Sequence, residues 1–234
     1  MRILVINPNS DERMTKNIQK SLDLYFDSDL IVRCFSTPEA PEFIENYEDE
    51  YKSGNGMIKL MRENMHNYDA FVIACHCDPN LDLLKEISDK PVVGIAEASM
   101  KLATFLGHRF SVISTDAHST PNKQALARKY HLEQLLASVR VPENITDLED
   151  PEPFYKEACR AIEEDGAEVI VLGCSGLTAI RENLQNRLKA PVLDSVICGV
   201  IAASGFVRHG VSISKVRRYC PAVQRELEDD SYGR

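Results

Sequence analysis

The sequence predicts an α/β protein of two pseudo-symmetric lobes, each a mostly parallel sheet flanked by helices. Two observations predict this fold. Short, continuously apolar runs alternate with helix-like segments, which is typical of parallel sheets covered on both faces. Three of these runs also recur in the same order about 100 residues later, and one recurring pair ends in a cysteine, at Cys75 and at Cys174.

The internal repeat sets the expected topology. Three segments of the first half match three of the second at offsets between 99 and 107 residues. Matched elements in the same order indicate a duplicated unit, so we expect Cys75 and Cys174 at equivalent places. The matching pairs are Arg2–Asn7 with Arg109–Ser114, Phe71–Asp78 with Val169–Gly176, and Pro91–Ile95 with Pro191–Ser195.

In the first half, each expected element follows from local residues. Asn9 or Ser10, in the turn after the first strand, can cap the helix that follows. Asp78-Pro79 is a good helix start, with Asp78 as the cap and proline at the first helical position. The segment 53–56 can interrupt a helix over Tyr47–Asn67. The other expected elements are strands over Ile3–Ile6, Leu30–Cys34, Ala70–Ala74 and Val92–Ile95, a loop over Thr37–Asn46 and a helix over Glu97–Leu106.

In the second half, strands are expected over Phe110–Ile113, Val169–Leu172 and Val192–Leu193. Helices are expected over Asn122–Tyr130, Pro151–Asp165, Thr178–Leu188 and Ile197–Arg208, with a long acidic surface loop over Pro142–Pro153. The helices after the paired strands are expected to carry the chain between lobes. We therefore assign residues 1–96 plus about 198–234 to an N-terminal lobe and residues 97–197 to a C-terminal lobe.

Composition narrows the class of protein. With 234 residues and 44% apolar side chains, the chain can bury one large core or two small ones. A net charge of −9 argues against a nucleic-acid surface, which needs a basic face. No apolar segment is long enough to span a membrane, and the N-terminus does not read as a signal peptide. The seven cysteines suggest reduced thiols in the cytoplasm rather than disulfides.

The paired cysteines suggest a chemistry. Each ends an apolar run before an expected helix start, which is where open α/β sheets place their sites. A thiolate is a capable base and a thiol a capable acid, with an ordinary pKa of about 8.5. One thiol on each face of a carbon could remove its proton and return another from the opposite side. The sequence therefore predicts an active site in the cleft between the lobes, with catalytic Cys75 and Cys174 and an enolate held by backbone amides of residues 76, 77, 175 and 176.

Five motifs resemble the aspartate/glutamate/hydantoin racemase superfamily, and within it most of all the hydantoin and allantoin racemases. Together they span most of the chain, and their combination is more specific than any one of them. They are Ile6-Asn-Pro-Asn-Ser10, Ile73-Ala-Cys-His-Cys-Asp-Pro79, Pro91-Val-Val-Gly-Ile-Ala-Glu-Ala98, Phe110-Ser-Val-Ile-Ser-Thr115 and Asp165-Gly-Ala-Glu-Val-Ile-Val-Leu-Gly-Cys-Ser-Gly176.

The resemblance implies a racemase or epimerase that needs no cofactor and uses two cysteines, which map to Cys75 and Cys174. It also implies a small-molecule substrate, two α/β lobes around the active site, and a homo-oligomer. The substrate-binding positions that it implies are Asn9, Ser10, His76, Cys77, Ser114, Thr115, Ser175 and Gly176.

The departures from the family pattern concern the substrate. His76-Cys77 replaces the family's Phe-Gly, and Ser175 replaces Ala. These polar residues favour a 5-substituted hydantoin that is small and polar, or an allantoin-like ureide, over a bulky aryl hydantoin. Two alternatives stay open: an aspartate/glutamate-type amino-acid racemase, and a non-catalytic protein that binds a small ligand on the same fold.

Other candidate groups carry weaker signals. Cys75-His76-Cys77 lacks the spacing of a zinc site, so we expect no metal. No phosphate loop or nucleotide fingerprint is present in the sequence, and we expect no bound cofactor. Asp78 and Asp194 are better explained as helix caps than as catalytic groups, and His118 as a solvated loop residue.

Overall fold

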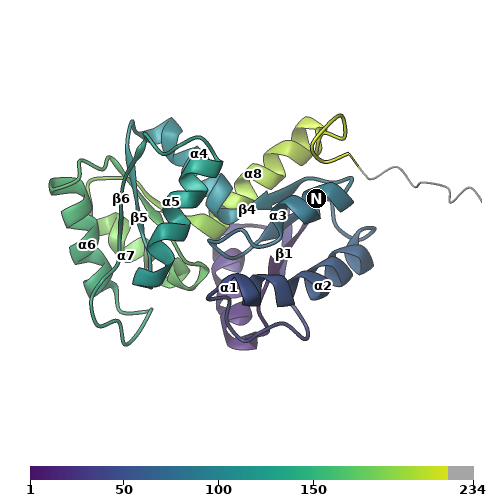
Figure 1. The fold of residues 1–234 in the computed structure, drawn as a ribbon, viewed down its shortest axis with the longest axis horizontal. Coiled ribbons are helices and arrows are strands. Elements are labelled where there is room, and N and C mark those ends of the chain that lie inside the picture. Colours follow the sequence, from purple (N-terminus) through teal and green to yellow (C-terminus); the bar gives the residue numbers. More distant parts are fainter. Residues whose placement is uncertain (221–234) are drawn as a thin grey trace, which may run out of the picture.

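A computed structural model describes residues 1–220, which form two lobes side by side, each built on a four-stranded parallel sheet (Figure 1). The first sheet has the order β2-β1-β3-β4 and the second the order β6-β5-β7-β8, so the two halves repeat one topology. This confirms the predicted fold class. The strands are β1 (Arg2–Asn7), β2 (Ile31–Ser36), β3 (Ala70–Ile73), β4 (Val92–Gly94), β5 (Phe110–Ile113), β6 (Leu136–Arg140), β7 (Val169–Leu172) and β8 (Val192–Asp194).

The central strands are buried because helices cover both sheet faces. Every residue of β3, β5 and β7 is buried, and successive side chains enter different cores. In β3, for example, Val72 packs into one apolar cluster while Phe71 and Ile73 pack into another. This explains why the sequence shows continuous apolar runs there rather than alternation. The helices are α1 (Glu12–Tyr25), α2 (Tyr47–Asn64), α3 (Leu81–Ile87), α4 (Ile95–Leu106), α5 (Thr120–Lys129), α6 (Pro151–Glu163), α7 (Arg181–Arg187) and α8 (Ser195–His209).

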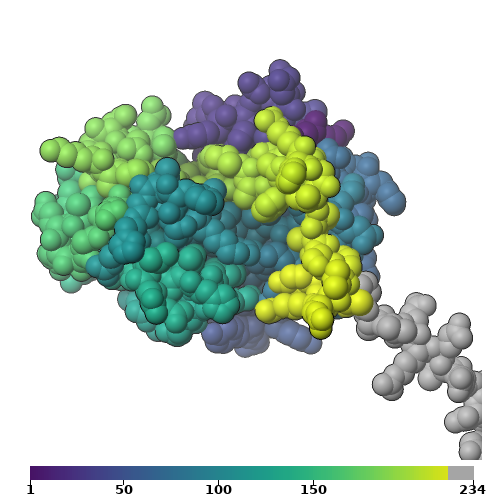
Figure 2. All heavy atoms as spheres, turned by 90° about the horizontal axis from the view of Figure 1, so that it is seen from above, coloured from purple at the N-terminus to yellow at the C-terminus, as the bar shows by residue number. Residues whose placement is uncertain are grey.

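Two helices are exchanged between the lobes. α4 follows the last strand of the first sheet, yet its Met100 and Ala103 pack with Phe110 and Val171 of the second sheet. α8 follows the last strand of the second sheet, yet its residues pack with Val72 and others of the first. Residues after α8 stay on the first lobe, where the yellow end of the described chain lies against the blue residues in Figure 2.

The predicted division into lobes stays a prediction, and so do its boundaries at residues 96, 97 and 198. The part of the N-terminal lobe assigned to residues 221–234 lies outside the described residues. Among the described residues, no helix combines the length and the apolar character that crossing a bilayer requires.

Two predicted helix caps and one predicted helix interruption differ from the structure. Asp11, not Asn9 or Ser10, caps α1 by accepting hydrogen bonds from two backbone amides. α2 runs through Gly54 and Gly56 without a break. At Gly56 the missing side chain lets a neighbouring segment approach, since a Cβ there would lie 2.5 Å from a methyl carbon of Thr37. The N-cap position of α3 is held by Asn80 rather than by Asp78.

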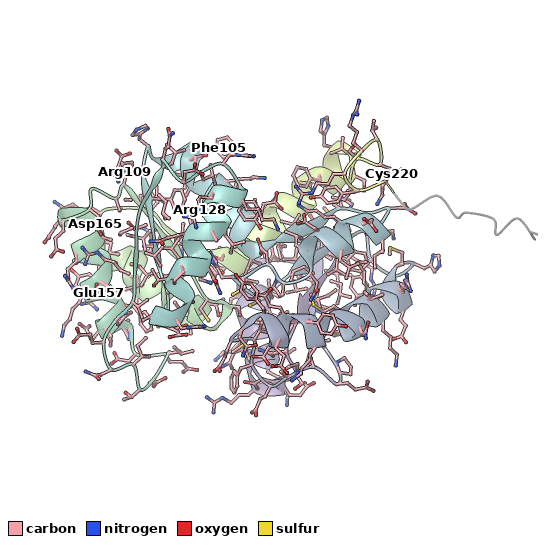
Figure 3. The ribbon with its side chains drawn as sticks, viewed as in Figure 1. Phe105, Arg109, Arg128, Glu157, Asp165 and Cys220 are labelled. Carbon is pink, nitrogen blue, oxygen red and sulfur yellow. The ribbon has the colours of Figure 1, made fainter. Side chains whose placement is uncertain are left out.

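Strand β6 is an element that the sequence analysis does not predict. All five of its residues are only half-buried, so the apolar run that marks the other strands is missing. Its last residue, Arg140, forms ion pairs with Glu157, Glu164 and Asp165 of the α6 region. Figure 3 labels Glu157 and Asp165 in that part of the second lobe.

Candidate active site

A cavity of about 260 Å³ opens between the lobes at the carboxyl ends of the parallel strands. Its wall comes from the turns after β1, β3, β5 and β7, from the starts of α1 and α5, and from two loops. Such an edge is where parallel sheets hold their ligands. The lining residues are Asn7, Asn9, Met14, Phe43, Ile44, Glu45, Ala74, Cys75, His76, Cys77, Ser114, Thr115, Asp116, Ser119, Asn122, Lys123, Leu148, Gly173, Cys174 and Ser175.

Cys75 and Cys174 both line this cavity, each just past the end of its strand. The backbone N–H of Gly176 donates to Cys174 Sγ over 3.4 Å. The two halves of the repeat thus bring one thiol each to one cavity.

Most of the predicted substrate-binding positions also line the cavity. They are Asn9, His76, Cys77, Ser114, Thr115 and Ser175. Ser10 and Gly176 do not line it: the Ser10 amide is bonded to the Pro41 carbonyl, and the Gly176 amide is bonded to Cys174.

The polar side chains of the first-strand turn are held in place by a buried network. The Asn7 side-chain amide donates to Asn9 Oδ1 over 2.6 Å and to Thr15 Oγ1 over 2.9 Å. The Asn9 side-chain nitrogen contacts the sulfur of Met14, another lining residue. Asn7 therefore fixes Asn9 at the cavity wall, a supporting role that the sequence analysis did not assign.

His76 is 1% exposed and has one ring nitrogen without a partner. Its Nε2 lies 3.3 Å from the Ser99 hydroxyl of α4, whereas Nδ1 has no hydrogen-bond partner among the described residues. Burial, aided by the charge of Lys123, lowers the pKa of His76 well below its usual range. His76 is therefore a neutral polar group rather than a cation at neutral pH.

Lys123 is the site residue that sequence reasoning missed. It is 3% exposed, and its ammonium donates to the His76 carbonyl over 2.6 Å and lies 3.9 Å from Cys77 Sγ. The available signal was its position on the buried face of α5, with Leu126 and Ala127 at spacings of three and four. A lysine on an apolar helix face needs a partner, but the sequence does not show which one.

Cys75 and Cys77 hydrogen-bond to each other through their side chains. The hydrogen bond from Cys75, together with the Lys123 ammonium, lowers the pKa of Cys77 to about 6. The same hydrogen bond and burial raise the pKa of Cys75. The negative charge of the pair therefore rests on Cys77, beside the lysine.

The two candidate caps act on the exchanged helices. The Asp78 carboxylate accepts the amides of Ala96 and Glu97 at the start of α4, and Asp194 accepts the first amides of α8. Burial raises the pKa of each to about 6. Capping is thus confirmed for Asp194. The prediction that Asp78 caps the helix directly after it is wrong, because its carboxylate accepts amides at the start of α4 instead.

Two further groups lie away from the cavity wall. Glu97 forms ion pairs with Lys85 and Lys101, and His118 is exposed on a short turn before α5. Neither lines the cavity. Among residues 1–220, no three His, Cys, Asp or Glu side chains are grouped as metal ligands would be.

Comparisons with known proteins agree with this architecture. The family model of the Asp/Glu/hydantoin racemases matches residues 3–203. A hydantoin racemase from Pseudomonas sp. (strain NS671) is 39% identical over 226 residues, which cover 94% of this chain and 91% of the relative. Two solved allantoin racemases are 30% identical. The Klebsiella pneumoniae structure has a TM-score of 0.89, covering 98% of this chain and 97% of its own, and the Pseudomonas fluorescens structure has 0.90, covering 97% and 99%.

Proposed function

Because the chain belongs to the Asp/Glu/hydantoin racemase family and is an isomerase of the racemase type, we propose that it inverts a carbon next to a carbonyl by two-cysteine proton transfer. The substrate that we propose is a 5-substituted hydantoin or an allantoin-like ureide. The observation that carries this proposal is the pair of strand-end thiols, Cys75 and Cys174, on the wall of one cavity.

In the proposed reaction, one cysteine is a thiolate and the other a thiol when substrate binds. The thiolate removes the proton from the carbon between the ring carbonyl and the ring nitrogen, and the thiol delivers its proton to the opposite face. Charge moves onto the carbonyl oxygen in the intermediate, so donors aimed at that oxygen lower the barrier. The backbone amides of His76 and Ser175, directly after the two cysteines, are the donors that we propose. No cofactor or metal takes part in this scheme.

The charges around the cavity favour a neutral ring. Lys123 is the one lysine or arginine among the described residues of its wall, and its ammonium is already bonded to the His76 carbonyl beside Cys77. The two acidic lining residues, Glu45 and Asp116, are exposed. An amino dicarboxylate brings two carboxylates, which would lack cationic partners here. A hydantoin or ureide brings N–H and C=O groups, which suit Asn9, Ser114 and Ser175.

The size of the cavity supports a small substrate. About 260 Å³ lies below the range of roughly 300–1,000 Å³ that is typical of sites for drug-sized ligands. The rim includes the half-exposed ring of Phe43, on the loop before α2. A compact ring with a polar substituent therefore suits the site better than a bulky aryl group.

A substrate panel tests this proposal. Polarimetry should show loss of optical rotation with allantoin and small 5-alkyl hydantoins, and none with aspartate or glutamate. The variant Cys75→Ser/Cys174→Ser measures spontaneous racemisation, and the wild type should exceed it by at least about 100-fold, as expected for general acid–base groups. Activity on aspartate or glutamate alone would assign the chain to the amino-acid racemases. Binding of a hydantoin without turnover would make it a ligand-binding protein.

We also propose a cytoplasmic location and a homo-oligomer. The first rests on the cysteine usage: all seven are free thiols, and Cys34 and Cys198 are buried in the core. The second rests on the resemblance to the racemase superfamily.

A further inference from the structure

A buried ammonium needs a negative partner, and the group beside the Lys123 ammonium is the thiol of Cys77. Among the described residues, no carboxylate forms an ion pair with Lys123. Its side-chain contacts are the His76 carbonyl, at 2.6 Å, and Cys77 Sγ, at 3.9 Å. A carbonyl supplies only partial charge, and an uncompensated charge in the interior is costly. The geometry therefore favours Cys77 as a thiolate.

Cys77 is also joined to the proposed catalytic thiol. Its side chain hydrogen-bonds to that of Cys75, two residues earlier in the same turn, and both thiols line the cavity. Two interacting thiols lose their protons in two separate steps that belong to the pair. A pair next to a cation holds one proton and one negative charge between these steps.

We propose that Cys75 and Cys77 work as one proton-sharing pair, in which Lys123 holds the negative charge on Cys77 and Cys77 exchanges a proton with Cys75 during turnover. This inference rests on the two-cysteine reaction proposed above. It makes Cys77 an acid/base group behind Cys75, and Lys123 a positioning residue that acts through Cys77.

The proton count of this scheme balances. In one state the pair holds one proton and Cys174 is a thiol; Cys75 becomes the base when its proton passes to Cys77. It then takes the proton from the substrate carbon while Cys174 gives one to the other face. The pair now holds two protons and Cys174 is a thiolate. The reverse reaction returns the pair to one proton, and the charge settles on Cys77 beside Lys123.

Other titratable groups surround the pair and enter its pH dependence. Glu50 of α2 and Cys77 both line a second hollow outside the active-site cavity. Burial, aided by the charge of Cys77, raises the pKa of Glu50 to about 7. Asp78 follows Cys77 in the chain and is bonded to Tyr130. The neutral ring of His76, with Glu45, Asp116 and Cys174, lines the cavity together with the pair. Asp82 and Lys129 line the hollow that Cys77 shares with Glu50. The test must therefore report thiolate itself, not only activity.

Ultraviolet absorbance of thiolates provides that readout without substrate. The measurement uses a Cys159→Ser/Cys220→Ser background, because burial raises the pKa of Cys34 and of Cys198 to about 12 and keeps both silent below about pH 8. We expect a thiolate to form with a midpoint near pH 6. Cys77→Ser should abolish this step and let Cys75 ionise nearer to the ordinary value of about 8.5. Lys123→Met should move the step upward by about one pH unit or more.

Controls separate the pair from general damage. Lys123→Gln is a second variant in case the methionine variant fails to fold. Arg128→Met removes a charge from an exposed position of the same helix, labelled in Figure 3, and should leave the step in place. A step that survives Cys77→Ser, or that does not move in either lysine variant, would overturn the proposal.

The pH profile of kcat/KM links the pair to turnover. The acid limb of the wild-type profile should lie near pH 6 and should move upward in Cys77→Ser and Lys123→Met, parallel to the absorbance step. A purely structural role would lower the rate at every pH and leave the limb where it is. If no substrate is turned over but the absorbance results hold, the racemase proposal fails and the thiol pair stands. If a substrate is turned over but the absorbance step is absent, the racemase proposal stands and the thiol pair fails.

Discussion

His76 shows what a single departure from the family motif does to the site. In the family pattern an apolar ring stands here, whereas His76 places a neutral imidazole against α4 with its Nδ1 unpartnered among the described residues. An unpartnered polar atom in the interior costs about 1–3 kcal/mol of stability. Because His76 lines the cavity, we expect a bound substrate to supply the missing hydrogen bond.

The variant His76→Phe separates substrate binding from packing. We expect its free energy of unfolding to equal or exceed the wild-type value by up to about 1 kcal/mol, because the unpartnered nitrogen is lost and the Ser99 hydroxyl still donates to the Ile95 carbonyl. KM for allantoin should rise about tenfold, whereas KM for a 5-alkyl hydantoin should change little. Urea denaturation and steady-state kinetics measure the two effects. Equal changes of KM for both substrates would show that the ring only fills the wall.

Among the site residues, those at strand ends could be located from the sequence. Cys75 and Cys174 could be predicted because the carboxyl ends of parallel strands meet at one edge. Ser114 and Ser175 were predicted as binding residues from the family resemblance. Lys123 could not be predicted, since its partner is in the other lobe, 46 residues away along the chain.

Helices α4 and α8 each begin at a buried aspartate carboxylate, but the two aspartates come from different places in the repeat. In the second half, Asp194 at the end of β8 caps the helix that it precedes. In the first half, Gly94 takes the matching position and leaves room for the Asp78 side chain, since a Cβ there would lie 2.3 Å from its carboxylate. The repeat thus conserves a buried carboxylate at each helix start, although different residues supply it.

The variant Asp194→Asn tests the cost of that buried charge. Because burial raises the pKa of Asp194 from 3.8 to about 6, the folded protein binds its proton more tightly than the unfolded chain does. Ionisation of Asp194 therefore destabilises the folded protein. This destabilisation is absent below about pH 4 and is complete above about pH 6. Asparagine accepts the same two amides without charge. We compare the free energy of unfolding of the variant with that of the wild type at each pH. The difference, variant minus wild type, should be about 2–3 kcal/mol larger at pH 8 than at pH 4.

Urea denaturation at the two pH values measures this difference. Asp150→Asn, at the exposed cap of α6, is the matched control, and its difference should stay small because water still hydrates that carboxylate. A relative stability of Asp194→Asn that does not vary with pH would contradict the account.

Elements were predictable where burial or capping leaves a local pattern. The strands β1, β3, β5 and β7 are wholly or almost wholly buried and stand out as apolar runs, whereas half-buried β6 leaves no such run. The cap of α4 was not predictable, because Asp78 is distant in the chain and its reach depends on a left-handed backbone at φ 48°.

For the whole molecule, the exchange of α4 and α8 explains why one cavity serves both halves. Each lobe is covered by a helix whose chain comes from the other, so the two sheets are fixed with their carboxyl ends toward a shared space. The repeat could be read from the sequence, and so could the two-lobe fold. The identity of the substrate could not, because it depends on side chains from both lobes that meet only after folding.

The central claim is that Cys75 and Cys174 act from opposite faces of one carbon, and stereospecific deuterium exchange tests it most directly. Each enantiomer of the substrate is incubated in D₂O with Cys75→Ser or with Cys174→Ser, and spontaneous exchange is subtracted. We predict that neither variant racemises the substrate, and that each exchanges the hydrogen of one enantiomer only, with opposite preferences. Exchange of the same enantiomer by both variants, or racemisation that persists in either, would contradict the two-cysteine mechanism.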